Sequence, residues 1–226
     1  MHFVLQVKNI KIFLDFSLTS VAPCKVSLIN KYRLKVSSIN VQHTKIWDIY
    51  IRIFHWGLLT AFATSYLTED DFPTIHVYAG YTMIALIMLR LVWGFIGSRY
   101  ARFNSFVVRP REVFKYLKDV MKFKAKHYLG HNPAGGAMVI TLLISLTLTL
   151  LFGLLTFGVN EYSGPLAGMA FSISEPIANI FEDLHELFAN FTLFLIVLHV
   201  IGVAIASFQH RENLVKSMIT GYKKLI

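Results

Sequence analysis

The chain has 226 residues, of which 55% are hydrophobic and only 15% are charged. Soluble domains usually carry about 25% charged residues, so the composition excludes an ordinary soluble domain and indicates an integral membrane protein. The net charge of +9 does not indicate nucleic-acid binding, because the lysines and arginines lie between long apolar segments instead of covering one folded domain.

Residues 1–43 differ in character from the rest of the chain. The segment Val4–Ser20 is apolar only in patches, since Lys8, Lys11 and Asp15 interrupt it. It is too weakly apolar for a spanning helix, and it lacks the apolar core and cleavage site of a signal peptide. We therefore expect an N-terminal extension that is poorly ordered, or an over-extended start of the chain, and we assign it no function.

Residues 44–226 are expected to form one membrane domain with four spanning helices, because a helix needs about 20 apolar residues to cross a bilayer. The predicted spans are 49–67, 74–96, 135–158 and 184–208. The predicted fold class is therefore an all-α integral membrane protein, a four-transmembrane-helix bundle.

The segments between the later spans also carry local signals. Arg109–Val120 is basic with regularly spaced apolar residues, which predicts an amphipathic helix on the membrane surface. Asn132 followed by Pro133 is typical of an N-cap and a first helical position, so the third span should begin there. The loop 159–183 contains two prolines and is expected to hold a short surface helix.

The distribution of charge predicts the topology. Of the 22 lysines and arginines, eight lie before Ile53, nine in Arg99–Lys126 and four from Arg211 onward, and none lies in 53–89 or 137–209. Acidic residues occupy the turns of those bare stretches. By the positive-inside rule, both termini and the basic loop are cytoplasmic in a multi-pass membrane protein.

Four histidines lie in the predicted spans, namely His55, His76, His185 and His199. Ionisable groups inside a membrane are expensive and are usually functional. His185 and His199 are fourteen residues apart on one helix face, about 21 Å along the axis at 1.5 Å per residue. With the termini inside, His55 and His199 share the inner depth and His76 and His185 the outer depth. Four imidazoles at two depths predict two bis-histidine haem sites, with these pairs as the axial ligands.

The histidines have other possible roles. A single buried histidine often only forms a hydrogen bond to a neighbouring carbonyl. Four histidines at matched depths make this explanation less convincing than haem ligation. A zinc or transport site would normally add carboxylates at the same depth, and the span interiors contain none. Cys24 is the only cysteine and no C-x-x-C-H motif exists, so the haems would be two non-covalent b-type haems. Gly57, Gly80 and Gly202 lie near the ligands and would let a flat macrocycle approach, although helix packing explains them equally well.

Two arginines are further candidates for binding the cofactor. Arg52 lies one turn before His55, and Arg90 lies in the inner half of the second span. A guanidinium at either place can pair with a haem propionate, while snorkelling to the interface is the alternative. His127 and His131 have the i, i+4 spacing of some metal-binding pairs, but no carboxylate lies close by in sequence, so we expect them to be solvated.

Short motifs around the histidines and the helix ends carry a resemblance. They are Trp47-Asp48 with Arg52–Trp56, His76–Tyr81, Arg90–Gly97 with Ala101–Phe103, Gly130–Gly136, Asp183–Glu186 and Leu198–Val203. In this combination, the chain from about residue 44 to residue 224 resembles the bacterial cytochrome b561 and nickel–iron hydrogenase cytochrome b subunit family. The resemblance implies a four-helix membrane protein with b haems on the four histidines, and a quinone as the substrate.

The resemblance also suggests the function. The leading interpretation is transmembrane electron transfer between the quinone pool and a periplasmic redox partner, such as a c-type cytochrome or a hydrogenase-like enzyme. Two alternatives are a stand-alone quinone-linked oxidoreductase and a membrane anchor subunit whose haems are chiefly structural. We expect the quinone site near the inner haem, where Arg52, Arg90 and residues 130–132 supply polar groups.

Overall fold

The computed structural model describes residues 3–7, 10–14 and 43–224. The chain divides into two units, Met1–Val41 and Gln42–Ile226.

The described residues of the first unit form a strand pair. β1 (Phe3–Val7) runs antiparallel to β2 (Ile10–Leu14). Most of the predicted N-terminal extension lies outside the described residues, so the expectation of poor order stays a prediction, as does the boundary of the membrane domain.

The second unit is helical apart from one short two-stranded sheet. Its elements in chain order are β3 (His43–Lys45), α2 (Ile49–Leu67), α3 (Pro73–Ile96), η1 (Phe103–Ser105), α4 (Pro110–Met121), α5 (Pro133–Val159), η2 (Ala167–Ser172), α6 (Glu175–His210), α7 (Leu214–Thr220) and β4 (Tyr222–Lys224). The structure therefore confirms that this part of the chain is predominantly α-helical.

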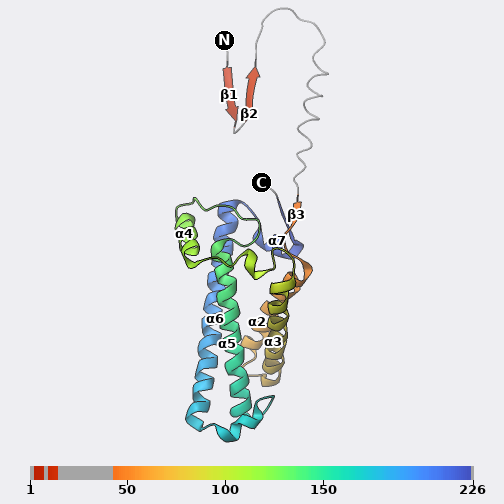
Figure 1. Cartoon of the computed structure of the whole chain (residues 1–226), viewed down its shortest axis with the longest axis vertical. Helices are drawn as coiled ribbons and strands as arrows, with labels where there is room; N and C mark the ends of the chain where they lie inside the picture. The colour runs from red at the N-terminus through yellow and green to blue at the C-terminus, as the bar shows by residue number, and fades with distance from the viewer. Residues whose placement is uncertain (1–2, 8–9, 15–42, 225–226) are drawn as a thin grey trace, which may run out of the picture. The chain divides into compact units, whose positions relative to one another are not determined.

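The four long helices form two hairpins. Figure 1 shows α2 beside α3 and α5 beside α6, and α3 also contacts α5. Of the described helices, α3, α5 and α6 are long and apolar enough to cross a membrane. α2 begins and ends at the predicted residues, but Arg52 and His55 lower its average hydropathy. A membrane-spanning role for α2 therefore stays a prediction.

The longest helix extends beyond its predicted span. Residues 184–208 were expected to be helical, whereas α6 begins nine residues earlier, at Glu175. Pro176 lies in the first turn, where its missing N–H leaves no hydrogen bond unmade. Acidic residues such as Glu182 end an apolar pattern without ending a helix, so hydropathy marks the membrane span and not the full helix.

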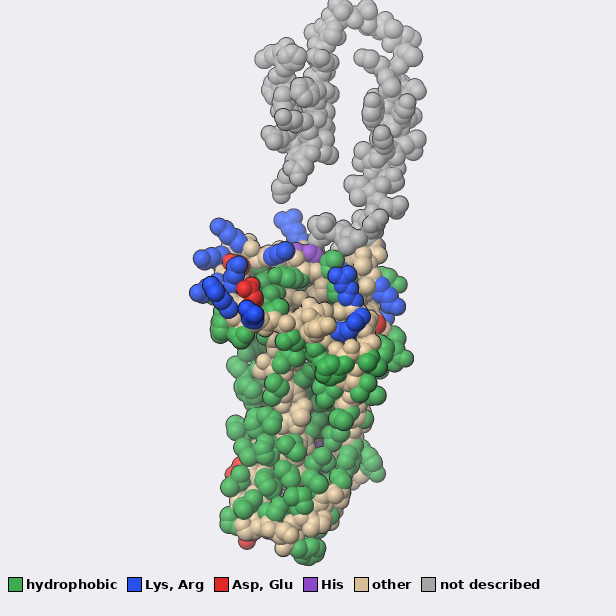
Figure 2. All heavy atoms as spheres, in the orientation of Figure 1, with side chains coloured by type: hydrophobic (Ala, Val, Ile, Leu, Met, Phe, Trp, Pro, Cys, Tyr) green, Lys and Arg blue, Asp and Glu red, His purple; other side chains and the backbone are tan. Residues whose placement is uncertain are grey.

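The surface of the second unit has an apolar belt with a charged band at one end. Figure 2 shows hydrophobic side chains along the long helices and Lys and Arg gathered at the end that carries α4 and α7. Large side chains are exposed within the belt, for example Leu89 at 67% and Val200 at 60%. Soluble monomers rarely expose such continuous apolar surface, so the belt faces lipid. We call the end with α4 and α7 the basic end and the opposite end the acidic end.

The buried core joins three of the long helices. It consists of Ala61 and Phe62 of α2, Met83 and Ile87 of α3, and Leu146 and Leu150 of α5. The residues of α3 and those of α5 are four apart, so each of these two pairs lies on one face of its helix. The core therefore fixes the α2–α3 hairpin against α5, and Ile196 of α6 packs against it.

The two ends of the second unit meet at the basic end. β3 pairs antiparallel with β4, and the Gly221 carbonyl accepts hydrogen bonds from the backbone N–H groups of Ile46 (2.8 Å) and Trp47 (3.1 Å). Gly221 has a φ of +88°, and a Cβ there would lie 2.7 Å from the Trp47 carbonyl oxygen. Glycine is therefore required by both the backbone conformation and the close approach.

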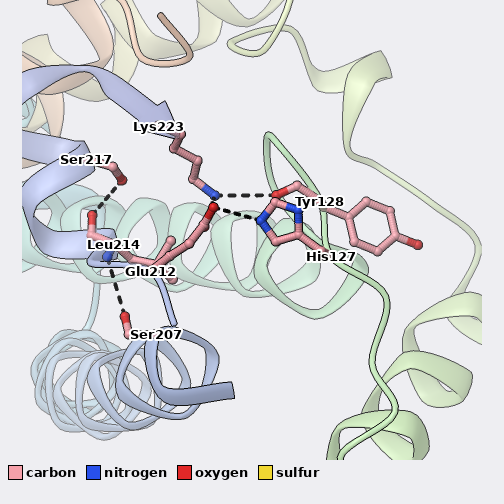
Figure 3. Close-up of polar contacts among 7 residues, drawn as sticks. All are labelled: His127, Tyr128, Ser207, Glu212, Leu214, Ser217 and Lys223. Atoms are coloured by element: carbon pink, nitrogen blue, oxygen red, sulfur yellow. Dashed lines mark hydrogen bonds and ion pairs between the residues drawn. The ribbon is translucent and has the colours of Figure 1, made fainter. Parts of the chain in front are cut away.

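A buried ion-pair cluster fastens the C-terminal segment to the loop before α5. Glu212 accepts from His127 Nε2 at 2.8 Å and pairs with Lys223 Nζ at 3.2 Å (Figure 3). Lys223 also donates to the Tyr128 carbonyl at 3.4 Å. The side chains of Glu212 and Lys223 are only 9% and 6% exposed. One carboxylate thus holds two segments far apart in the sequence.

Replacing Glu212 by glutamine should destabilise the basic end. Lys223 would then keep its buried charge without a carboxylate, and breaking one partner of a buried pair costs about 3 kcal/mol or more. We expect a lower midpoint of thermal unfolding in detergent for Glu212→Gln. The matched control is Glu161→Gln, since Glu161 is exposed at the acidic end. Equal midpoints for the two variants would contradict the assigned role.

Candidate functional site

His55 and His199 face one another in the half of the molecule nearer the basic end. His55 lies in the first half of α2 and His199 in the last part of α6. Their ring centroids are 6.3 Å apart, and the ring planes are inclined by 52°. Both side chains are half-buried. The structure therefore brings together the two histidines that were predicted to share the inner depth.

His76 and His185 face one another nearer the acidic end. His76 lies in the first turn of α3 and His185 ten residues into α6. Their ring centroids are 6.0 Å apart, with the planes inclined by 84°. These rings are also half-buried. Since α6 contributes one member of each pair, it carries both sites on one face.

The second pair has its ring orientation set by backbone carbonyls. The Nδ1–H of His76 donates to the Ser65 carbonyl at 2.9 Å, and that of His185 donates to the Thr149 carbonyl at 2.8 Å. Such bonds select the tautomer in which Nε2 carries the lone pair. Metal-ligating histidines usually donate their second nitrogen in this way.

Two residues of α5 that the sequence analysis did not single out support His185. Thr149 supplies the carbonyl, and its hydroxyl belongs to a buried cluster in which the hydroxyls of Ser145 and Thr192 lie 2.7 Å apart. A Cβ at Gly153 would lie 2.8 Å from His185 Cε1. Thr149 and Gly153 are one turn apart on α5. A small residue one turn after a threonine was therefore the sequence pattern that could have indicated this support for His185.

The arrangement of both pairs fits a flat macrocycle with a central metal. Since a metal–imidazole bond is about 2 Å and the ring centroid lies about an ångström further out, two axial imidazoles place their centroids roughly 6 Å apart. The observed separations of 6.3 and 6.0 Å agree with this spacing. A Cβ added at Gly80 or Gly202 meets no described atom within 4 Å, so open space lies beside each of these glycines.

Arg90 is a buried cation whose guanidinium lies 6.0 Å from the ring centroid of Phe54, the residue before His55. It is 3% exposed, and its Nη2 donates to the Ala101 carbonyl at 3.0 Å. Its guanidinium also lies 4.8 Å from the centroid of the Phe103 ring. Among the described residues, the buried Nη1 has no hydrogen-bond partner. Since an unpaired buried donor costs free energy, this atom is suited to an acceptor oxygen that the protein itself does not supply.

Arg52 is tied to the C-terminal segment. One of its terminal nitrogens donates to the Ile219 carbonyl, while its Nε is buried and has no partner in the part of the chain that the structure describes. Arg52 is therefore held in place by α7 and keeps one donor for another group. The hydrogen bond between Arg52 and the Ile219 carbonyl could not be predicted from the sequence.

Asp48 orders the start of α2, the helix that carries Arg52. Its carboxylate caps the helix by accepting from the Ile51 N–H at 2.9 Å and also accepts from Trp93 Nε1 at 3.1 Å and the Ser98 hydroxyl. Burial raises the pKa of Asp48, but these hydrogen bonds outweigh it and hold the pKa below its usual range. The ionised carboxylate therefore stays in place at neutral pH.

His131 is not solvated, and the prediction that it would be is wrong. Its ring lies 4.7 Å from that of Trp47 and 4.6 Å from that of Phe106, measured between centroids. Its Nδ1 is buried and has no partner within the described residues. Burial, followed by the nearby charges of Arg90 and Lys223, lowers the pKa of His131 to about 3. The neutral ring thus adds to the polar atoms that lack a partner among the described residues, which also include Arg52 Nε, His55 Nδ1 and Arg90 Nη1.

Residues 46–221 match the family described as prokaryotic cytochrome b561. A relative from Rhizobium leguminosarum bv. viciae, named "Probable Ni/Fe-hydrogenase B-type cytochrome subunit", is 25% identical over 219 residues, covering 81% of this chain and 90% of the relative. A relative of the same name from Bradyrhizobium diazoefficiens is 21% identical over 211 residues, covering 79% and 85%. No solved structure matches the chain.

Proposed function

The chain belongs to the prokaryotic cytochrome b561 family, a family of b-haem membrane electron-transfer proteins, and on that basis we propose that it carries electrons through two b haems across the bacterial inner membrane. In this proposal His55 and His199 bind one haem and His76 and His185 the other. The electrons pass between the quinone pool and a redox partner in the periplasm.

The observation that carries the proposal is that two histidines on one face of α6 each pair with a histidine of another helix. α6 presents His185 and His199 fourteen residues apart, and each meets a histidine of the α2–α3 hairpin at 6.0 or 6.3 Å between centroids. Fourteen residues of helix span about 21 Å, so the two sites lie at opposite depths of a bilayer whose apolar core is about 30 Å thick.

The protein's own residues would hold and tune the two cofactors. When bound, the b haems supply a one-electron carrier at each depth. Ser65 and Thr149 fix the ring orientation of the outer histidines through their carbonyls. At the inner site, the unpaired Nη1 of Arg90 and Nε of Arg52 are the donors that would hold the propionates.

We place the quinone site beside the inner pair. An apolar groove of about 360 Å³ lies between α3 and α5, lined in part by Leu91, Phe103 and Ile144. Phe103 also lies under the Arg90 guanidinium, so the groove adjoins the polar nitrogens of Arg90. An isoprenoid tail suits the groove, and the head group would then meet polar atoms that can hydrogen-bond and exchange protons. Reduction there would take protons from the cytoplasm.

The redox partner is proposed to dock at the acidic end. Two relatives are named as B-type cytochrome subunits of a nickel–iron hydrogenase, which favours a hydrogenase-like partner over a c-type cytochrome. The loops at this end carry acidic residues and no lysine or arginine, including Glu69, Asp70, Asp71 and Glu161. A negative surface would attract a partner with a positive patch.

Reduction by a quinol in vesicles tests the proposed function. Protein reconstituted in lipid vesicles should show b-haem absorbance changes within seconds of adding a menaquinol or ubiquinol analogue. The control is dithionite, which reduces accessible haem without a quinone site. If dithionite reduced the haems but neither quinol did, the electron-transfer proposal would fail, and the protein would instead be a haem-containing anchor.

The proposed orientation has its own test. A fluorescent reporter fused after Ile226 should fold and fluoresce in the cytoplasm, and an alkaline phosphatase inserted near Ser163 should be active in the periplasm, because lysine and arginine are retained inside. The same two reporters exchanged between the sites serve as the control. The opposite pattern would invert the assignment of inner and outer pairs but would leave the pairs themselves unchanged.

A further inference from the structure

The surface helix α4 (Pro110–Met121) has features that the proposed electron transfer does not use. It lies between the end of α3 and the start of α5, at the basic end of the molecule (Figure 1). It packs against α5, and its buried residue Tyr116, which is 6% exposed, lies 5.8 Å from the ring of Tyr128 between centroids. Val113 and Val120 flank Tyr116 on the same face and are half-buried. One face of α4 therefore packs against the rest of the protein.

A second, apolar face of α4 is uncovered. Phe114, Leu117 and Met121 are 65%, 42% and 73% exposed. They recur three and four residues apart, so they form one stripe. With about 100° between successive residues, this stripe lies roughly a quarter turn from the face that contacts α5. Val107 and Phe123, at either side of the helix, are also exposed, at 52% and 72%, so they add to the uncovered apolar surface.

The charges of α4 are sorted around the same apolar stripe. Arg111, Lys115, Lys118 and Lys122 are all exposed, and their spacing of three and four residues puts them on one flank of the helix. Glu112 and Asp119 fall on the side opposite the apolar stripe, by the same rotation of about 100° per residue. The order around the helix is thus apolar, basic and then acidic, with the protein contact completing the circle.

We propose that the apolar stripe of α4 enters the bilayer at the basic end and that its basic flank binds the phosphate groups of anionic phospholipids. Charge complementarity identifies the lipid class, since each lysine or arginine near an anionic membrane surface contributes about 1 kcal/mol. The location of α4 supports insertion of the stripe at the membrane surface, because the helix adjoins the inner ends of two spanning helices. Figure 2 shows the basic band there next to the hydrophobic belt. The acidic residues then face the cytoplasm, away from the lipid phosphates.

The depth of the helix can be measured with a single nitroxide label. In a Cys24→Ser background, a cysteine is introduced at Leu117 or at Glu112, labelled, and the protein is reconstituted in vesicles of phosphatidylglycerol and phosphatidylcholine. We expect the label at position 117 to collide more with oxygen than with a water-soluble nickel chelate, and the label at position 112 to show the reverse. Chelate access at position 117 equal to that at position 112 would overturn the proposal and assign the stripe to a protein partner.

The lipid class is tested by the lipids that co-purify with the protein from the same mixed vesicles. Lys115→Gln/Lys118→Gln should reduce the retained ratio of phosphatidylglycerol to phosphatidylcholine on the order of tenfold, as expected from the removal of two surface cations. The matched control Lys126→Gln/Lys216→Gln removes the same charge from exposed residues outside α4 and should keep the wild-type ratio. An equal ratio in both variants would show that the flank does not select anionic lipid.

Discussion

Replacing His185 by alanine should remove one haem and leave the other. The purified wild type should contain two haems per chain with the spectrum of six-coordinate bis-histidine iron. His185→Ala keeps His76 but leaves that site with one axial ligand, so the haem near the acidic end should be lost. His199→Ala should remove the haem near the basic end in the same way. Haem content by the pyridine haemochrome assay, together with the reduced-minus-oxidised spectrum, measures both results.

His210→Ala is the matched control for these variants. His210 lies at the end of α6, and its ring lies 5.3 Å from that of His127, outside both proposed sites. This variant should keep both haems. The double variant His76→Ala/His185→Ala should lose no more haem than His185→Ala, since both residues serve one site. Retention of both haems after every single replacement in the two pairs would refute the ligand assignment.

Replacing Arg90 by alanine should have the next largest effect, at the inner haem and at the quinone site. The guanidinium is 3% exposed and has one unpaired nitrogen among the described residues, so its removal takes away the main donor near His55 and His199. Groups around a metal site typically contribute ten- to a hundredfold, by order of magnitude, to affinity or activity. We expect quinol-driven reduction to slow by at least about tenfold, with the spectrum of the outer haem unchanged.

Two further variants make the Arg90 result interpretable. Arg90→Lys keeps the positive charge and should recover part of the rate, although lysine cannot reproduce the planar fork of a guanidinium. Arg99→Ala removes an exposed arginine near the same end and should behave like the wild type. If Arg90→Ala kept both haems and the normal rate of quinol-linked reduction, the reason for choosing the inner side as the quinone site would be removed.

Periodicity and charge were sufficient to predict the helices that organise the molecule. The ends of α2 coincide with the predicted residues, and α3 and α5 differ from prediction by at most two residues at each end. Asn132 caps α5 as expected, with its side chain accepting from the Gly135 N–H at 2.7 Å. A membrane protein is favourable for such predictions, because lipid requires each spanning segment to be apolar and to satisfy its own backbone hydrogen bonds.

The partners of the four histidines were also accessible from the sequence. The direction of each helix follows from the order of the spans, and a residue's place along its helix then gives its relative depth. His55 could therefore share a depth only with His199, and His76 only with His185. The structure brings the same two pairs within 6.3 and 6.0 Å between centroids.

Only the tertiary structure decided which groups support these pairs and which unpaired polar atoms surround them. The carbonyls of Ser65 and Thr149 belong to the backbone, which has the same chemistry at every position. Their role therefore cannot be predicted from the type of residue. His131 appeared to be a solvated residue of a basic loop until folding placed Trp47 and Phe106 against its ring. The sequence determined depth and helical face because each residue advances a helix by about 1.5 Å and turns it by about 100°. Burial and hydrogen bonding between distant segments instead depend on contacts that only the folded chain makes.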